Sequence, residues 1–186
     1  ASLRGMASPG SRESSNPIVG SSNRIAGTGI AGLDRILNGG FARRRFFLVE
    51  GSPGSGKTTL ALQFLIEGAR QGEAVLYVTL SETREQLEAG ARAHRMDLAG
   101  VSFLELIPSA GVLDGEEQYT MFQPSEVELA ATTRAVLDEV EKIRPQRVVI
   151  DSLSDMRLVA GNPLRYRRQI LALKQFLSGR DCTVVL

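Results

Sequence analysis

Residues 51–58 read Gly51-Ser52-Pro53-Gly54-Ser55-Gly56-Lys57-Thr58 and match the pattern G-x-x-x-x-G-K-[ST]. This pattern is typical of a phosphate-binding loop that joins a β-strand to a helix. Its glycines tolerate positive φ angles, so consecutive N–H groups and the helix N-terminus can face an anion. We therefore predict a Mg²⁺·nucleoside triphosphate site formed by this loop and Thr59. Lys57 is expected to contact the β- and γ-phosphates, and the Thr58 hydroxyl to bind Mg²⁺.

The composition around this loop is that of an ordinary globular protein. The 186 residues are 42% hydrophobic and 23% charged, and the formal net charge is +1. A chain of this length can bury a sizeable core, and its near-neutral charge provides no bulk attraction to nucleic acid or to a membrane surface. Its single cysteine excludes an internal disulfide framework. No apolar segment reaches the length of a membrane span and no signal peptide is visible, so a cytoplasmic location is expected.

Strands and helices alternate along most of the chain. Residues 1–23 are rich in Ser, Gly, Pro and Asn and are expected to be a flexible leader, followed by one domain over residues 24–186. Apolar runs predict the strands, and helical spacing with capping signals predicts the helices. The predicted strands are 46–50, 74–79, 101–107, 147–151 and 182–186; the predicted helices are 57–70, 83–95, 125–143 and 162–178, with an irregular connection at 108–124. This order favours an α/β fold with a largely parallel sheet, helices on both faces, and a ligand site at the carboxyl ends of the strands.

A second candidate for the nucleotide site is the residue that ends the predicted strand 147–151. Asp151 follows three buried-type residues, Val148-Val149-Ile150, and would lie at the carboxyl edge of the sheet, near the phosphate loop. A carboxylate there can hold Mg²⁺ directly or through water. By itself the pattern also fits an aspartate that caps a helix; together with the phosphate loop it predicts Asp151 as a Mg²⁺ ligand. The guanine-specific pattern [NT]-K-x-D does not occur in the sequence, which favours ATP.

Four segments occur in an order that resembles one known family. They are the flank Thr28–Asp34 (T-G-I-A-G-L-D), the phosphate loop, the strand end Ser81-Glu82-Thr83, and residues 148–152. In this order they resemble the RecA-like P-loop ATPases, most closely the KaiC-like branch, over residues 25–186. The S-E-T turn and the lack of zinc-type cysteines favour a KaiC-like over a RadA-like chain.

This resemblance implies several properties. The fold would be a three-layer RecA-like P-loop fold, with strand 182–186 between the phosphate-loop strand and the Asp151 strand. The activity would be ATP hydrolysis with Mg²⁺ in a homo-oligomeric ring, often a hexamer, with ATP between subunits. Signalling or clock-like regulation, with regulatory protein partners, would be the setting.

The carboxylate expected to assist Lys57 in catalysis departs from the family pattern. KaiC-like proteins commonly carry two adjacent glutamates at the end of the second strand, the first of them catalytic, whereas this chain has Ser81-Glu82. Glu82 is the carboxylate that can take this role, one position later than in the family, and neighbouring strand residues point to opposite faces. A turn could re-aim its side chain. The alternative is a glutamate in the first turn of a helix, where it favours the helix dipole.

Three functions are compatible with these observations. The first is the KaiC-like ATPase, and the second is a nucleotide-dependent assembly or switch module with negligible hydrolysis, which Ser81 favours. The third is a RadA-like DNA-binding recombinase, which the near-neutral charge disfavours.

The sequence stops inside the apolar run 182–186, so the fold is expected to continue beyond Leu186, or to lack a pairing element there. Residues that reach a neighbouring subunit's ATP, sensor residues and the phosphosites of autokinase members would all follow Leu186. Nothing in the chain supports autokinase activity.

Overall fold

A computed structural model of the protein describes residues 24–106 and 124–186. The predicted leader, residues 1–23, lies outside the described residues, as does nearly all of the predicted connection at 108–124. Within the described residues, no helix is long and apolar enough to cross a membrane.

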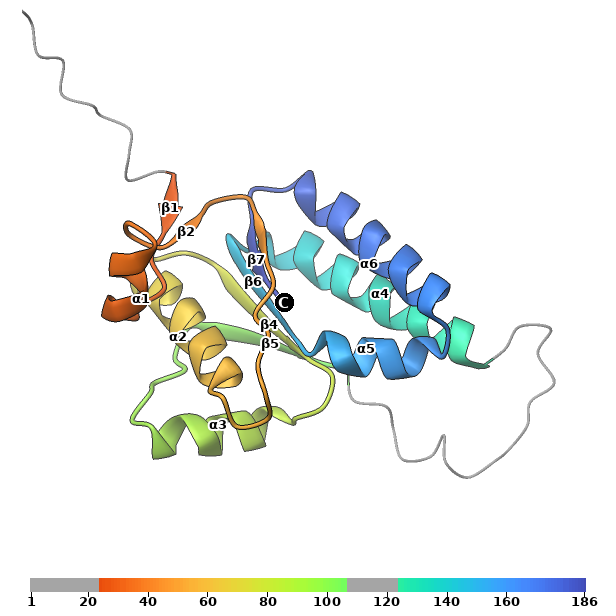
Figure 1. Ribbon diagram of the computed structural model, residues 1–186, viewed down its shortest axis with the longest axis horizontal. Coiled ribbons are helices and arrows are strands. Elements are labelled where there is room, and N and C mark those ends of the chain that lie inside the picture. The colour runs from red at the N-terminus through yellow and green to blue at the C-terminus, as the bar shows by residue number, and fades with distance from the viewer. Residues whose placement is uncertain (1–23, 107–123) are drawn as a thin grey trace, which may run out of the picture.

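A five-stranded parallel sheet forms the centre of the fold (Figure 1). Its strands lie in the order β3-β7-β6-β4-β5, and every pair of neighbours is parallel. Their bounds are β3 Phe46–Phe47, β4 Val75–Thr79, β5 Val101–Glu105, β6 Arg147–Asp151 and β7 Thr183–Val185. The strand β7 lies between β3 and β6, which confirms the order that the family resemblance implies. A separate antiparallel pair joins β1 (Ile25–Ala26) to β2 (Phe41–Ala42).

Helices cover both faces of this sheet (Figure 1). One layer contains α1 (Ala31–Ile36), α2 (Lys57–Arg70) and α3 (Arg84–Ala93), and the other contains α4 (Pro124–Ile143), α5 (Leu153–Ala160) and α6 (Pro163–Ser178). Because side chains alternate along a strand, β4 supplies both cores: Val75 and Tyr77 pack with the residues of α2, and Leu76 and Val78 pack with those of α4 and α6. The result is the predicted three-layer α/β architecture.

Capping residues set the starts of two helices as predicted. At α3, Thr83 Oγ1 accepts a hydrogen bond from Gln86 N (3.2 Å), and Gln86 Oε1 accepts one from Thr83 N (2.8 Å), which completes a capping box. At α6, Asn162 Oδ1 accepts from Leu164 N at 2.8 Å, with a proline at the first helical position.

The start of α4 differs from the prediction. The helix begins at Pro124, one residue before the predicted capping residue Ser125. A proline suits the first helical position because its fixed φ is already helical and its missing N–H would have no intrahelical partner there.

Four short elements lie outside the predicted set: β1, α1, β2 and α5. Each spans two to eight residues, too few for a hydrophobic period to emerge. The helix α5 matters most, since it begins two residues after Asp151 and places its side chains next to the carboxyl end of β6.

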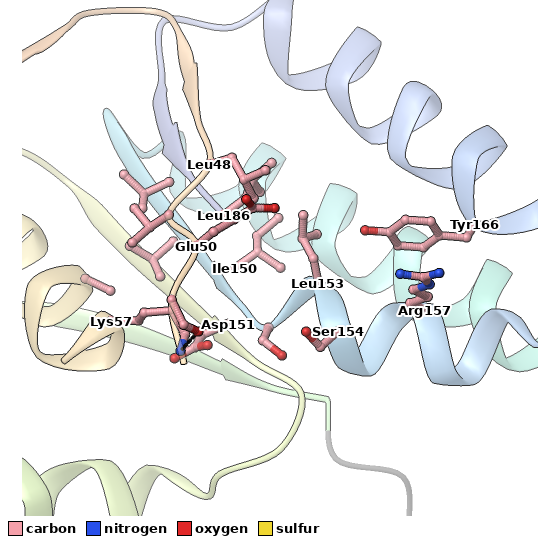
Figure 2. Close-up of a pocket in the computed structure, with 16 residues that line it drawn as sticks. Leu48, Glu50, Lys57, Ile150, Asp151, Leu153, Ser154, Arg157, Tyr166 and Leu186 are labelled. Carbon is pink, nitrogen blue, oxygen red and sulfur yellow. Dashed lines mark hydrogen bonds between the residues drawn. The ribbon is translucent and has the colours of Figure 1, made fainter. Parts of the chain in front are cut away.

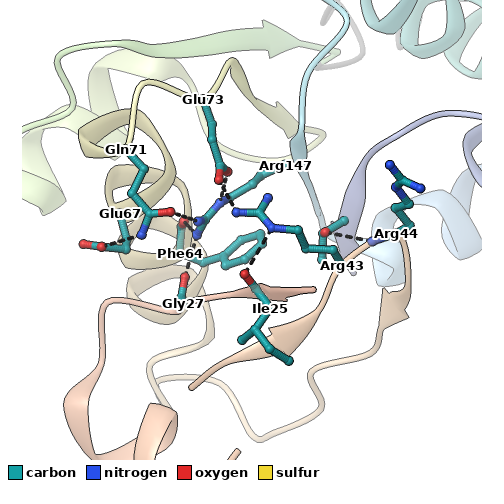
Figure 3. A network of polar contacts seen from close by, with 10 residues as sticks. Ile25, Gly27, Arg43, Arg44, Phe64, Glu67, Gln71, Glu73 and Arg147 are labelled. Atoms are coloured by element: carbon teal, nitrogen blue, oxygen red, sulfur yellow. Dashed lines mark hydrogen bonds and ion pairs between the residues drawn. The ribbon is translucent and has the colours of Figure 1, made fainter. Parts of the chain in front are cut away.

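A buried ionic cluster joins the antiparallel pair β1–β2 to the amino-terminal end of β6 (Figure 3). The phosphate loop lies at the opposite, carboxyl edge of the sheet. Arg147 begins β6, is completely buried, and donates hydrogen bonds to Glu73, to Phe64 O (2.8 Å) and to Gly27 O. Glu73 also accepts from Arg43, directly after β2. Burial opposes the ionisation of Glu73, but the hydrogen bonds and charges of the two arginines outweigh it and hold the pKa of this carboxyl below its ordinary value.

Candidate nucleotide-binding site

The phosphate loop connects β3 to α2 at the carboxyl edge of the sheet. Gly54 and Gly56 have φ angles of 77° and 87°, in the left-handed region that favours glycine. A Cβ atom added at Gly51 would lie 2.5 Å from Ser55 Oγ, so the Ser55 side chain would have to move to accommodate any side chain there. Gly54 and Gly56 therefore adopt the positive φ angles that the sequence predicts for glycines of this loop.

Lys57, the first residue of α2, bends back over the loop. Its Nζ donates hydrogen bonds to Gly51 O (2.8 Å) and to Ser52 O (3.0 Å). The ammonium group is thus held at the concave side of the loop, where phosphates are predicted to bind.

Asp151 receives two hydroxyl donors on one carboxylate oxygen. Its Oδ2 accepts hydrogen bonds from Thr58 Oγ1 at 2.9 Å and from Tyr77 OH at 2.6 Å. The two residues predicted to bind Mg²⁺, Thr58 and Asp151, are thereby in direct contact, although they are 93 positions apart in the sequence. Tyr77 is not among the predicted site residues.

The phenol of Tyr77 is held in its protonated form. Burial, the charge and hydrogen bond of Asp151, and the charge of Glu82 all raise the pKa of Tyr77 far above its ordinary value. Tyr77 is therefore a permanent hydrogen-bond donor to the carboxylate.

Glu82 lies in the turn that follows β4. Thr79 fixes this turn, since its Oγ1 donates to Glu82 O (2.6 Å) and accepts from Glu82 N (3.1 Å). The helix α3 begins at Arg84 with Thr83 as its cap, so Glu82 is not a first-turn helix residue, and that alternative is wrong. The Glu82 side chain is exposed, and its charge acts on the hydroxyl of Tyr77.

A cavity of about 380 Å³ adjoins the loop (Figure 2). Lys57 and Asp151 lie at one end, and Arg157 of α5 and Tyr166 of α6 lie at the other. The sequence did not indicate Arg157, because the helix that carries it was not predicted. Eight apolar residues also line the cavity: Leu48, Val49, Ala61, Val149, Ile150, Leu153, Val185 and Leu186. Glu50, Gly51, Ser152 and Ser154 complete the lining.

The donor chemistry at Asp151 fits Mg²⁺ that is shared with a nucleotide. Among the residues that the structure describes, no group of three or more His, Cys, Asp or Glu side chains could hold a metal ion. Mg²⁺ at nucleotide sites commonly takes one or two protein oxygens and completes its shell with phosphate oxygens and water. The Thr58 hydroxyl and the Asp151 carboxylate are such a pair.

The family model described as "ATPase: KaiC" matches residues 26–186. The chain belongs to this family. It is 31% identical over 167 residues to UPF0273 protein MK0039 of Methanopyrus kandleri, covering 86% of this chain and 64% of that protein. It is 32% identical over 169 residues to a UPF0273 protein of Thermotoga maritima, covering 84% and 66%. It is also similar to the circadian clock oscillator protein KaiC of Picosynechococcus sp., with 33% identity over 146 residues, 78% of this chain and 26% of that one. This KaiC-family chain therefore spans less than two thirds of the length of each of these relatives.

In this KaiC-family chain, the flank Thr28–Asp34 packs against α2. The Thr28 side chain is completely buried, and its N and Oγ1 donate to Asp34 Oδ1 at 2.8 and 2.7 Å. Gly29, with a φ of 76°, lies so close to α2 that an added Cβ would be 3.1 Å from the Cβ of Glu67. The flank thus packs against the helix that begins at the phosphate loop.

Proposed function

We propose that this chain binds ATP with Mg²⁺ and hydrolyses it. The observation that carries the proposal is the 2.9 Å hydrogen bond between Thr58 Oγ1 and Asp151 Oδ2, beside the Lys57 ammonium. A hydroxyl on the phosphate loop and a carboxylate at the end of another strand of the same sheet are the protein ligands that Mg²⁺ uses between β- and γ-phosphates. When bound, the ion would neutralise charge that develops on the phosphate oxygens.

Hydrolysis also requires a group that orients the attacking water. Glu82 is the candidate, because its turn follows β4, the strand next to β6. The two hydrogen bonds of Thr79 hold the backbone of this turn. The Glu82 carboxylate is exposed and could extend toward a γ-phosphate. The preceding position holds a serine, which is no base at neutral pH, so we expect slow turnover.

Phosphate release by the purified chain tests this proposal. Lys57→Ala should abolish both nucleotide binding and hydrolysis, because the phosphates lose their principal cation. Glu82→Gln should retain binding of a fluorescent ATP analogue and lower kcat by about 100-fold. The matched control is Glu85→Gln, three residues later in the first turn of α3, which should leave both unchanged. An unchanged kcat in Glu82→Gln would remove Glu82 from the mechanism.

A nucleotide-dependent assembly module is the second candidate, and Ser81 is the observation that favours it. In this case ATP would order a ring, which the family resemblance implies to be a hexamer, for regulation by protein partners and with negligible hydrolysis. Light scattering with and without Mg²⁺·ATP separates the two candidates. A rise in mass without phosphate release above the Lys57→Ala background supports the second, and an unchanged monomer contradicts it.

A further inference from the structure

We propose that Tyr77 is a positioning residue that orients Asp151 for Mg²⁺. The inference rests on the proposed function, because it concerns the Mg²⁺ that accompanies the nucleotide. Its basis is the 2.6 Å hydrogen bond from Tyr77 OH to Asp151 Oδ2, the shortest contact to this carboxylate oxygen among those described above.

The sheet register explains why this tyrosine reaches the carboxylate. Thr79 of β4 lies opposite Asp151 of β6, and Tyr77 lies opposite Val149, two residues back. Side chains two residues apart on a strand point to the same face, so Tyr77 is the diagonal neighbour of Asp151 on the face covered by α2. Strands about 4.8 Å apart with a rise of about 3.3 Å per residue place these diagonal Cα atoms about 8 Å apart. That separation is too long for most side chains but is spanned by an aromatic ring with a terminal hydroxyl.

Packing fixes the direction of this hydroxyl. The Tyr77 side chain is completely buried, and its ring packs against the ring of Phe103 on β5, with 5.7 Å between centroids. A ring enclosed in this way cannot turn its hydroxyl elsewhere without disturbing the core beneath α2.

Two donors on Oδ2 define the plane of the carboxylate. One comes from Thr58 in the first turn of α2, and the other from Tyr77 in β4. These bonds restrain the rotation of the carboxylate, and the other oxygen, Oδ1, is the one that would be available to Mg²⁺. The Thr58 oxygen is itself a predicted Mg²⁺ ligand, so Tyr77 is the donor whose only task at this site is to hold Asp151.

Tyr77→Phe tests this role, because it removes the hydroxyl and keeps the ring. The full chain is titrated with Mg²⁺ in the presence of a fluorescent ADP analogue, and affinity for the same analogue is measured in EDTA. Loss of an outer hydrogen bond to a metal ligand typically weakens metal binding by 10–100-fold. Because Thr58 remains, we expect the Mg²⁺ midpoint to rise by about tenfold, with EDTA affinity changed by less than about twofold.

Two further variants separate this role from a general loss of stability. Thr183→Val removes another buried hydroxyl, at the far end of the sheet, where it accepts from Arg44 N; it should lower stability and leave the Mg²⁺ midpoint unchanged. In an Asp151→Asn background, Tyr77→Phe should have no further effect on the midpoint. The inference is overturned if Tyr77→Phe leaves the Mg²⁺ midpoint unchanged, or if it weakens nucleotide affinity equally in EDTA. In either case, nucleotide binding that depends on Lys57 would still uphold the proposed function. If the wild-type chain binds no nucleotide at all, both fail.

Discussion

Neutralising Glu73 should destabilise the protein strongly, because this carboxylate is shared by two arginines. In Glu73→Gln the shape is retained, but Arg147, which is completely buried, and Arg43, whose side chain is 19% exposed, lose their common anion. Removing one partner of a buried ion pair costs about 3–5 kcal/mol. Since Arg147 keeps the carbonyl oxygens of Gly27 and Phe64, we expect a loss at the lower end of this range, about 3 kcal/mol in the free energy of unfolding.

The loss should depend on pH. The pKa of Glu73 is lower in the folded than in the unfolded chain, so its contribution to stability is complete above the ordinary glutamate pKa of about 4.3 and disappears as the pH falls through the lower, folded value. The wild type and Glu73→Gln should therefore differ most at neutral pH and converge in acid. Urea denaturation followed by circular dichroism, at neutral pH and at several values below about 4, measures this difference.

A matched substitution gives the baseline for this measurement. Glu88→Gln breaks two surface pairs on α3, with Arg84 (2.7 Å between N and O) and with Arg92 (3.9 Å). It should cost no more than about 0.5 kcal/mol. A difference for Glu73→Gln below about 1 kcal/mol at neutral pH, or one that persists unchanged in acid, would refute the reasoning.

Three further predictions concern the loop, a helix cap and the cysteine. Gly51→Ala should weaken nucleotide-analogue binding, because the new methyl would lie 2.5 Å from Ser55 Oγ and force this side chain of the loop to move; unchanged affinity in a fluorescence titration would contradict this. Asn162→Ala should lower the urea-derived stability by about 1 kcal/mol through loss of the bond from Leu164 N, and no change would discount the cap. Cys182 is 1% exposed and burial raises its pKa to about 11, so a thiol reagent should label the native chain at least about 100-fold more slowly than the urea-unfolded chain; similar rates would show that this strand opens readily.

The parts of the fold that sequence could predict are those with a long pattern and a clear boundary. The helix α2 and the strand β6 have the predicted bounds, because one follows the phosphate loop and the other lies between Pro145 and a terminal aspartate. The predicted strand 46–50 is shorter in the structure, where β3 covers only two residues, although Val49 N still donates to Leu186 O at 2.8 Å.

The parts that could not be predicted depend on contacts between distant segments. Tyr77 looks like any buried strand residue until the register places it diagonally from Asp151. Arg147 looks like a solvent-exposed strand start, since its partner Glu73 is 74 residues away in the sequence. Local patterns cannot indicate either pairing, because each is set by the order of strands in the sheet.

The strand β6 carries the buried Arg147 at its first residue and Asp151, the carboxylate proposed to bind Mg²⁺, at its last. Arg147 fixes one end through Phe64 O of α2 and Gly27 O directly after β1, and Asp151 lies four residues, about 13 Å, further along. Inserting or deleting one residue between them would move the carboxylate by about 3.3 Å and turn it to the opposite face of the sheet. Among descendants of this chain, length changes should therefore accumulate in its loops and never within residues 147–151.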